Sequence, residues 1–259
     1  MALAVVTGAG KRLGREMALY LAQREFDVAV HFSGSENAAN EVVGAVRSLG
    51  RKAVALKADF LNENQVERIV PDAAAALGGP VTCLVNNASI FEHDTVHTTT
   101  RASWDRHLES NLRAPFVLTQ AMARQGLEPK SDAAGEPVAA GLVVNMIDQR
   151  VRKPTPEFMS YTIAKMGLWA MTKTTAQALA PAIRVNAIGP GPTLQAERQS
   201  DAHFSAQRAS VPLARGSNPE DITAALGYFL DAPAVTGQLL CVDGGQHLAW
   251  ATPDVLGVE

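Results

Sequence analysis

The stretch Val6–Ala18, VTGAGKRLGREMA, follows an apolar run and puts a glycine-rich turn directly before a helical pattern. Such a turn leaves backbone N–H groups and the positive end of the helix dipole free to face a phosphate. The glycines are Gly8, Gly10 and Gly14, so the G-x-G-x-x-G spacing is missed by one residue. Glycine spacing alone therefore leaves two interpretations open, a phosphate-binding turn and a tight turn without a ligand.

Short apolar runs alternate with longer helical patterns along the whole chain. The runs expected to be strands lie at 3–7, 27–32, 52–58, 81–86, 142–147, 183–188 and 238–242. They are continuous rather than alternating, which is typical of parallel strands covered on both faces. Helical patterns lie near 12–25, 36–49, 63–77, 101–124, 157–179 and 219–230. The alternation predicts an α/β fold, a single-domain, Rossmann-like, doubly wound parallel sheet of about seven strands flanked by helices.

Composition narrows the class of protein. The 259 residues are 47% hydrophobic and 19% charged, with a formal net charge of −3, which gives no basic footprint for nucleic acid. No run approaches the ~18 apolar residues that cross a bilayer. Cys83 and Cys241 stand in apolar runs, so a disulfide framework is not expected. We therefore expect a cytoplasmic protein with a small-molecule substrate and no nucleic-acid or membrane partner.

Two segments lack a clear period. Ser131–Pro137 reads SDAAGEP and is expected to be an exposed loop. Pro190–Val211 begins with GPGPT and then turns polar, and it is the longest stretch without periodicity. Long segments of this kind inside a domain are often lids over ligand sites. We expect a substrate lid at about 190–211.

The end of the second expected strand indicates which dinucleotide would bind beside the glycine turn. A site for NAD has an Asp or Glu there, which holds the ribose hydroxyls. This strand ends VAVHFSGSEN, and no acid occurs before Glu36. Ser33 and Ser35 offer hydroxyls, and Arg12 offers a cation, to a 2′-phosphate, so NADP(H) is favoured. Arg12 is alternatively a solvated residue, although a cation at a helix N-terminus opposes the dipole unless an anion binds.

Tyr161 and Lys165 form the pair YTIAK, and residues four apart on a helix share a face. A lysine cation near a phenol stabilises the phenolate and is expected to lower the pKa of Tyr161. Tyr161 would then be a general acid for a carbonyl or imine that receives hydride. Taken alone, the pair also fits an ordinary surface pair.

Asp148 directly follows the apolar run in GLVVNMIDQR, with no turn residue between. A carboxylate at the end of a buried strand costs free energy unless another group pairs with it or uses it. It lies thirteen residues before Tyr161. Two interpretations remain, a solvated loop acid and a member of the same site as the tyrosine.

These segments together resemble the short-chain dehydrogenase/reductase family along nearly the whole chain. That family commonly has TGxxxGxG, and here Thr7, Gly8 and Gly14 match it while Arg12 stands at the middle glycine. The segment LVNNASIF matches the family's NNAG, with Ser89 in place of the glycine. The order of phosphate turn, NNA segment and YxxxK makes the resemblance specific.

The resemblance implies one reductase domain over 1–259, with a nucleotide-binding half at about 1–110, and it implies roles for individual residues. Asp59 matches an acid that hydrogen-bonds the adenine amino group, and Asn111 matches an asparagine that holds a water for proton relay. Most relatives have a serine where Asp148 stands. The implied cofactor contacts are Gly8, Arg12, Leu13, Gly14, Ser33, Ser35, Asp59, Phe60, Asn87, Ala88, Ser89, Tyr161, Lys165, Pro190, Gly191 and Thr193.

TGAGKRLG, a His-aromatic pair at the end of the second strand, NNAS-x-Phe and an Asp-Tyr-Lys triad resemble more narrowly the pteridine reductases, including dihydromonapterin-type reductases. There, the arginine matching Arg12 contacts the pyrophosphate and the pterin, and the phenylalanine matching Phe91 stacks on the pterin opposite the nicotinamide. The implied substrate contacts are Phe91, Arg12, Asp148 and Tyr161. Taken alone, Phe91 equally fits a core position. Some members have an arginine where Gly34 stands, so part of a 2′-phosphate clamp is missing here.

The resemblance implies an NADPH-dependent oxidoreductase that transfers hydride to a C=N or C=O of a pterin-like substrate, reducing a dihydropterin to a tetrahydropterin. A reductase of ketones, acyl thioesters or sugars is one alternative, and a non-catalytic NADP(H) sensor is another. Members are often homotetramers, so Trp250 is expected to pack, against a neighbouring subunit in that case. No metal site is expected, since no third ligand accompanies His93 and His97.

Overall fold

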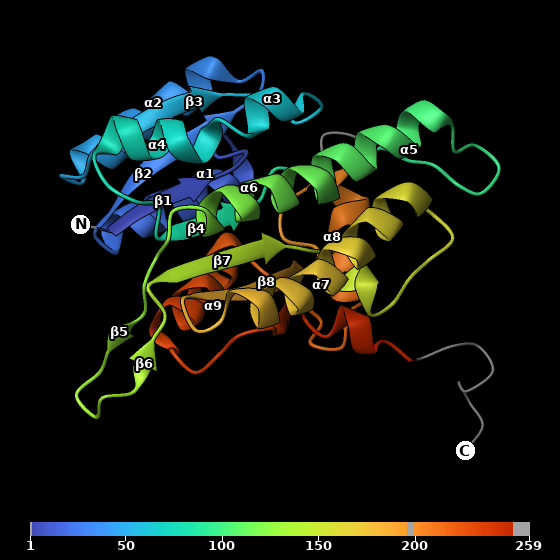
Figure 1. The fold of residues 1–259 in the computed structure, drawn as a ribbon. Coiled ribbons are helices and arrows are strands. Elements are labelled where there is room, and N and C mark those ends of the chain that lie inside the picture. Colours follow the sequence, from blue (N-terminus) through green and yellow to red (C-terminus); the bar gives the residue numbers. More distant parts are fainter. Residues whose placement is uncertain (1, 196–198, 251–259) are drawn as a thin grey trace.

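Seven parallel strands form one sheet in the order β3-β2-β1-β4-β7-β8-β9 (Figure 1). The computed structural model describes residues 2–195 and 199–250. All seven expected strands are confirmed. They are β1 (Ala2–Val6), β2 (Phe26–Phe32), β3 (Ala53–Lys57), β4 (Cys83–Asn86), β7 (Gly141–Met146), β8 (Ile183–Pro190) and β9 (Leu239–Val242).

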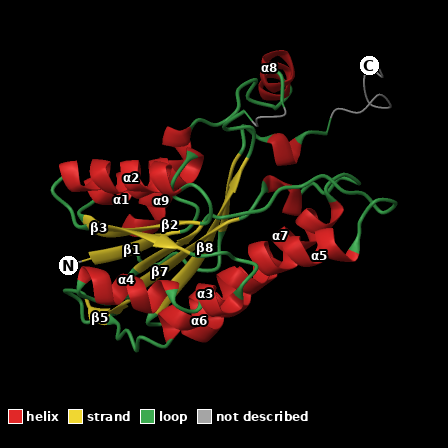
Figure 2. Cartoon of the chain, turned by 90° about the horizontal axis from the view of Figure 1, so that it is seen from above, coloured by secondary structure: helices red, strands yellow, loops and turns green. Residues whose placement is uncertain are grey.

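Helices cover both faces of the sheet, as Figure 2 shows. One face carries α1 (Arg12–Gln23), α2 (Glu36–Ser48) and α9 (Pro219–Asp231). The other carries α3 (Glu63–Val66), α4 (Ile69–Leu77), α5 (Arg101–Leu108), α6 (Ala114–Ala123) and α7 (Met159–Leu179). A short helix, α8 (Asp201–Ala209), stands apart from both layers. The predicted doubly wound α/β architecture is therefore correct.

The helix expected over 63–77 is interrupted between α3 and α4. Pro71 explains the break, because its ring would clash with the carbonyl of Glu67 in a continuous helix and its nitrogen cannot donate. In the first turn of a new helix beginning at Ile69, the same proline is tolerated. The helix expected over 101–124 likewise contains a π-helical turn at Glu109–Arg113.

Two short elements were not predicted. The segment expected to be an exposed loop is a projecting hairpin, in which β5 (Lys130–Ser131) pairs with β6 (Pro137–Val138), and its residues are mostly exposed. The expected lid contains α8. This helix was not predicted, because its sequence is largely polar and shows no clear apolar period. Residues 196–198 of the lid lie outside the described part of the chain.

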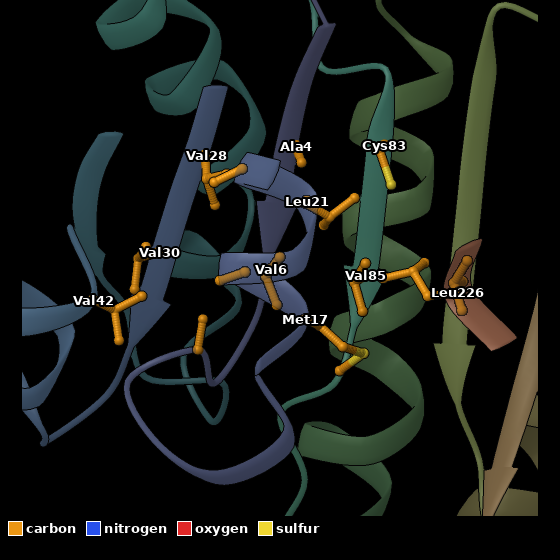
Figure 3. Close-up of a cluster of buried hydrophobic side chains, with 14 of the residues drawn as sticks. Ala4, Val6, Met17, Leu21, Val28, Val30, Val42, Cys83, Val85 and Leu226 are labelled. Atoms are coloured by element: carbon orange, nitrogen blue, oxygen red, sulfur yellow. The ribbon is translucent and has the colours of Figure 1, made fainter. Parts of the chain in front are cut away.

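Strand β1 supplies side chains to two cores in alternation. Ala4 and Val6 face the cluster that contains Met17 of α1 (Figure 3). Leu3 and Val5 face the other cluster, beneath α4 and α6. Because both faces are buried, the strand is continuously apolar, which is why the expected runs located the strands so closely.

The glycine turn after β1 is closely packed. Gly8 has a φ of +62°, which favours glycine. A Cβ on Gly14 would lie 2.3 Å from the Gly8 carbonyl oxygen and 2.6 Å from Asn87 Nδ2. No side chain fits there, so α1 approaches the turn only because position 14 is glycine.

Gly14→Ala is expected to destabilise the fold by ~1–3 kcal/mol through overpacking. The midpoint of thermal unfolding should fall by roughly 2–12 °C for a chain of this size. Gly44→Ala is the matched control, because Gly44 lies in α2 and a Cβ there meets nothing within 4 Å. Its midpoint should rise by a few degrees, since alanine favours helix by about 1 kcal/mol. Equal effects of the two variants would contradict this packing.

Candidate active site

A cleft of about 530 Å³ lies where β1, β4, β7 and β8 end. Its wall contains Gly8 after β1, Asn87 after β4, Asp148 after β7 and Gly191 after β8, and α8 of the lid completes it with Phe204 and Gln207. The chain reverses its winding direction between β1 and β4. Ligands of open α/β sheets bind at such switch points, outside the carboxyl ends of the strands.

The glycine turn is held from below by His31. The Gly8 amide donates to His31 Nδ1 at 3.0 Å, and His31 Nε2 lies 3.1 Å from the Ala58 carbonyl oxygen. Burial lowers the pKa of His31 to about 4, so the ring is neutral, with Nε2–H donating to Ala58. Phe60 stacks on this ring at a centroid distance of 4.4 Å. The neutral imidazole therefore links the ends of three strands beneath the turn.

Asn87 and Ala88 are fastened to the same turn. Both of their amides donate to Thr7 Oγ1 at 2.9 Å, and Asn87 Nδ2 donates to the Thr7 carbonyl at 2.8 Å. The TG turn and the NNA segment, some eighty residues apart, thus form one unit of the cleft floor. This local geometry explains why both motifs occur together in the sequence.

The turn fits a dinucleotide pyrophosphate, because a glycine cradle opens onto the N-terminus of α1 with Lys11 and Arg12 on the cleft wall. Arg12 has a φ of +53° and donates to the carbonyls of Leu194 and Gln195 at 3.0 and 2.7 Å. Its side chain is exposed, but these two hydrogen bonds tie the glycine turn to the start of the lid.

Ten of the expected cofactor contacts lie on the cleft wall. They are Gly8, Arg12, Leu13, Gly14, Asn87, Ala88, Ser89, Pro190, Gly191 and Thr193. The other six do not line the described cleft, namely Ser33, Ser35, Asp59, Phe60, Tyr161 and Lys165. Ser33 and Asp59 are exposed, and Phe60 is buried against His31.

Asp148 and Tyr161 are brought together. The Tyr161 hydroxyl donates to Asp148 Oδ2 at 3.0 Å, and the Arg150 amide donates to Asp148 Oδ1 at 2.9 Å. Asp148 is half-buried on the cleft wall, and the side chain of Tyr161 is buried directly behind it. The interpretation of Asp148 as a solvated loop acid is therefore wrong.

Lys165 does not act on Tyr161 as expected. Its Nζ donates to the Met146 carbonyl at 2.8 Å and lies 5.7 Å from the centroid of the tyrosine ring. Burial, reinforced by the neighbouring Asp148 carboxylate, raises the pKa of Tyr161 well above its usual value. The prediction of a lowered tyrosine pKa is wrong, because burial disfavours the phenolate and the neighbouring Asp148 carboxylate disfavours it further.

Burial perturbs both charged partners of the tyrosine. It raises the pKa of Asp148, opposed by the Arg150 amide, the Arg150 charge and the hydrogen bond from Tyr161. It lowers the pKa of Lys165 to about 8, opposed by the Asp148 charge. Each group is thus shifted toward its neutral form.

Asn111 lies in the π-helical turn, where its side chain is fully engaged. Its Oδ1 accepts from the Ile90 amide and its Nδ2 donates to the Ile90 carbonyl, both at 2.8 Å. The side-chain amide therefore orients the segment that carries Phe91. π-helical turns are frequent at functional sites.

Three aromatic rings gather at one end of the cleft. Phe91 stacks on Phe158 at 4.3 Å and contacts the edge of Tyr161 at 4.6 Å. The side chain of Phe91 is 40% exposed on the cleft wall, so it is not core filler. Phe158, which sequence reasoning missed, has a φ of +59° just before α7.

A buried polar network holds the start of α7. The Glu92 amide donates to His107 Nε2 at 3.1 Å, so Nε2 is an acceptor and the proton of the neutral ring is on Nδ1. His107 Nδ1 then donates to Ser160 Oγ at 2.7 Å. Ser160 Oγ in turn donates to Asp94 Oδ2, and the Ser160 amide donates to Asp94 Oδ1. The network fixes the backbone next to Tyr161 against the segment that carries Phe91.

Comparison with known proteins agrees with this geometry. The family model of short chain dehydrogenases matches residues 2–204. The chain belongs to the short-chain dehydrogenase family.

Relatives within the short-chain dehydrogenases differ in their named activities. The chain is 29% identical to 3-oxoacyl-[acyl-carrier-protein] reductase FabG of Staphylococcus epidermidis, over 95% of this chain and 98% of that protein. It is 28% identical to a short-chain type dehydrogenase/reductase of Picea abies, over 94% and 92% of the two chains.

Solved structures of short-chain dehydrogenases include nearer likenesses. FolM alternative dihydrofolate reductase 1 from Brucella suis, in complex with NADP, is 41% identical with a TM-score of 0.89 over 98% of both chains. The Brucella canis protein, also with NADP, is 41% identical with a TM-score of 0.90 over 98% and 97%. A metagenomic blue fluorescent protein in complex with NADPH is 29% identical with a TM-score of 0.83 over 95% and 97%.

Two further residues of this short-chain dehydrogenase were missed from the sequence. Gln149 lies on the cleft wall, and its Oε1 is buried without a hydrogen-bond partner among the described residues. Arg150 lines the same wall and lies over Phe158. The segment DQR carried a signal for both, because residues that directly follow a buried parallel strand stand at the ligand edge of the sheet.

Asp148→Asn is expected to alter how stability depends on pH. Because burial raises the folded-state pKa of Asp148, its stabilising contribution is complete below the unfolded value of ~3.9 and is lost as pH rises through the folded value. The variant should therefore gain stability over wild type as pH rises through this window. Chemical denaturation from pH 4 to 8 measures the difference. Asp132→Asn, in the exposed hairpin, is the control, and a parallel trend there would contradict the assignment.

Ser160→Ala should cost ~1–3 kcal/mol, because it removes the link between His107 and Asp94 inside the protein. Urea unfolding measures the loss. Ser48→Ala, at an exposed helix position, should stay within ~0.5 kcal/mol of wild type. An unchanged free energy of unfolding in Ser160→Ala would mean that the buried network does not hold α7.

Proposed function

We propose that the protein is an NADPH-dependent oxidoreductase that reduces a pterin-like C=N or C=O, converting a dihydropterin to a tetrahydropterin. The observation that carries the proposal is the hydrogen bond between Tyr161 and Asp148 on a cleft walled by Phe91. Serine, the usual residue there, can donate to a carbonyl oxygen. An ionised carboxylate accepts only, which suits a substrate ring that presents N–H groups.

The fit of the glycine turn to a pyrophosphate supports the cofactor assignment, as do similar structures in complex with NADP or NADPH. Bound NADPH supplies the hydride. In the proposed assignment the ten cleft residues contact the phosphates and nicotinamide, while Ser33, Ser35, Asp59 and Phe60 serve the adenosine half. Arg12 exchanges the lid carbonyls for the pyrophosphate and the substrate ring.

Proton supply falls to the chain's own residues. Tyr161 keeps its proton in the resting site and donates it to a ring nitrogen as that atom gains basicity. Asp148 orients the phenol and returns a proton to it, since burial already shifts the carboxylate toward its protonated form. Lys165 holds the nicotinamide ribose, and the Asn111 main chain holds a relay water. Both are proposals that follow from the position of these residues behind the cleft wall.

The substrate ring is proposed to stack on Phe91, as an electron-poor bicyclic ring would on a phenyl face. Gln149 adds a second acceptor, because its Oε1 is buried and unpartnered among the described residues. Buried polar atoms without partners are rare in proteins, and one on a cleft wall is well suited to a ligand N–H. Asp148 and Gln149 together favour a ring edge rich in donors, as in a 2-amino-4-oxopterin.

A 3-oxoacyl or other carbonyl reductase is the second candidate, supported by the likeness to FabG. The aspartate in place of a serine donor disfavours it. A non-catalytic NADP(H) sensor has no use for the Asp148–Tyr161–Lys165 set. NADPH oxidation followed with 7,8-dihydropterins and with 3-oxoacyl thioesters separates the candidates, since turnover of thioesters alone would reject the pterin assignment.

We further propose a cytoplasmic homotetramer. No described helix is long and apolar enough to cross a membrane. The side chain of Trp250 is 71% exposed in the single chain, and its packing against a neighbouring subunit remains a proposal.

Tyr161→Phe should lower kcat for a dihydropterin by at least ~100-fold, the contribution typical of a general acid. The affinity for NADPH should change little, because the ring and its packing remain. Stopped-flow hydride transfer and fluorescence titration with NADPH measure the two effects. Tyr228→Phe, on the exposed face of α9, is the control. Retained turnover in Tyr161→Phe would reject the proposed mechanism.

A further inference from the structure

Arg150 is a cation on the cleft wall that the proposed reaction does not use. Among the described residues, four charged ones line the cleft, Lys11, Arg12, Asp148 and Arg150. Lys11 and Arg12 flank the glycine turn at the phosphate end, and both oxygens of Asp148 already accept hydrogen bonds. Of these four, Arg150 is the one that brings a positive charge near the aromatic ring of Phe158.

The guanidinium of Arg150 is held in place by a hydrogen bond and a ring contact, neither of which neutralises its charge. Its Nη1 donates to Thr155 Oγ1 at 2.7 Å, and its central carbon lies 5.0 Å from the centroid of Phe158. Within residues 2–195 and 199–250 it forms no ion pair, whereas Arg24, Arg106 and Arg113 each pair with a carboxylate. An arginine presents five N–H donors in a fork that matches a carboxylate or a phosphate. Most of that fork is left for a ligand.

The position of Arg150 indicates which part of a ligand it would meet. Phe158 contacts both Arg150 and Phe91, with 5.0 Å from the guanidinium to the Phe158 centroid and 4.3 Å between the two ring centroids. The guanidinium therefore lies no more than about 9 Å from the ring on which the pterin is proposed to stack. A charged group on the substituent of a stacked pterin would lie within reach of a cation at this position.

Residues of the lid would contact the substituent of the pterin ring. Phe204 and Gln207 of α8 stand three residues apart on one face and line the cleft, as does Gln199 before the helix. An aromatic ring and amide groups suit a tail with an apolar stem and polar end groups. Asp148 is the one carboxylate that lines the described cleft, and its oxygens already accept hydrogen bonds from the Tyr161 hydroxyl and the Arg150 amide.

We propose that Arg150 binds an anionic group on the substituent of the pterin ring, which makes the preferred substrate an anionic dihydropterin rather than one with a neutral hydroxyalkyl tail. The inference rests on the proposed function. The anion is a carboxylate, as in a dihydrofolate, or a phosphate, as in a phosphorylated dihydropterin. Arg150 acts on substrate selection and touches no reacting atom.

Three substrates test the inference with the full chain and NADPH: 7,8-dihydrofolate, 7,8-dihydroneopterin 3′-phosphate and uncharged 7,8-dihydroneopterin. For Arg150→Gln, kcat/KM should fall about 10- to 100-fold more for an anionic substrate than for dihydroneopterin, as expected for a charge-assisted hydrogen bond. The effect should appear mainly in KM. Whichever of the two anionic substrates shows the larger ratio identifies the anion. Arg150→Lys should recover part of the loss, since it keeps the charge without the fork.

Lys153→Gln is the matched control, because Lys153 is an exposed cation three residues away that does not line the cleft. It should leave all three kcat/KM values within about twofold of wild type. Equal losses for all three substrates in Arg150→Gln, or no loss, would overturn the role of Arg150 while leaving the proposed function intact. Wild-type protein that turns over none of the three would instead reject the proposed function, and the inference with it.

Discussion

The hydrogen bond from Tyr161 to Asp148 joins the first turn of α7 to the end of β7, and the chemistry of the cleft depends on it. A carboxylate withdrawn from water is costly unless donors satisfy it. Here the phenol satisfies one oxygen and the Arg150 amide the other. Each group needs the other, so the loop after β7 and the start of α7 must keep a fixed separation. The network of His107, Ser160 and Asp94 fixes that separation from the far side of the helix.

Parallel topology explains why residues so distant in sequence meet at one cleft. Strands β1, β4, β7 and β8 are neighbours in the sheet and all end at the same edge. Each contributes the residues that immediately follow it, so the glycine turn, the NNA segment, Asp148 and the lid converge at this edge. Fastening Asn87 to Thr7 then gives the floor a rigidity that turns alone would lack. The sheet therefore positions the strand ends, and the loops that follow them carry the polar side chains of the cleft.

Sequence reasoning succeeded where a single physical constraint dominates. Burial on both faces made the strands continuously apolar, and the spacing from Asp148 to Tyr161 correctly predicted a shared site. It failed where the outcome depends on which of several partners a group selects. The pair Tyr161–Lys165 indicates proximity, but the sequence cannot indicate that Lys165 Nζ donates to Met146 while Asp148 takes the phenol. Arg12 selects lid carbonyls for the same kind of reason. Phe158 was not predicted as a site residue. Its own backbone is left-handed just before α7, and the sequence has no glycine or asparagine there that would indicate such a turn.

The shifts of Asp148 and Lys165 change how the tyrosine must work. Burial moves both groups toward their neutral forms, so neither drives Tyr161 toward phenolate. Its proton is instead held between the ring and the carboxylate, with a raised pKa that makes spontaneous release unfavourable. Such a phenol donates only to an acceptor that becomes strongly basic during the reaction, as a ring nitrogen does when the adjacent carbon receives hydride. A ketone oxygen also becomes strongly basic when its carbon receives hydride, so the raised tyrosine pKa by itself does not separate the two kinds of substrate. A carbonyl oxygen would, however, have to approach a carboxylate that repels it, whereas an N–H group of a ring can donate to that carboxylate.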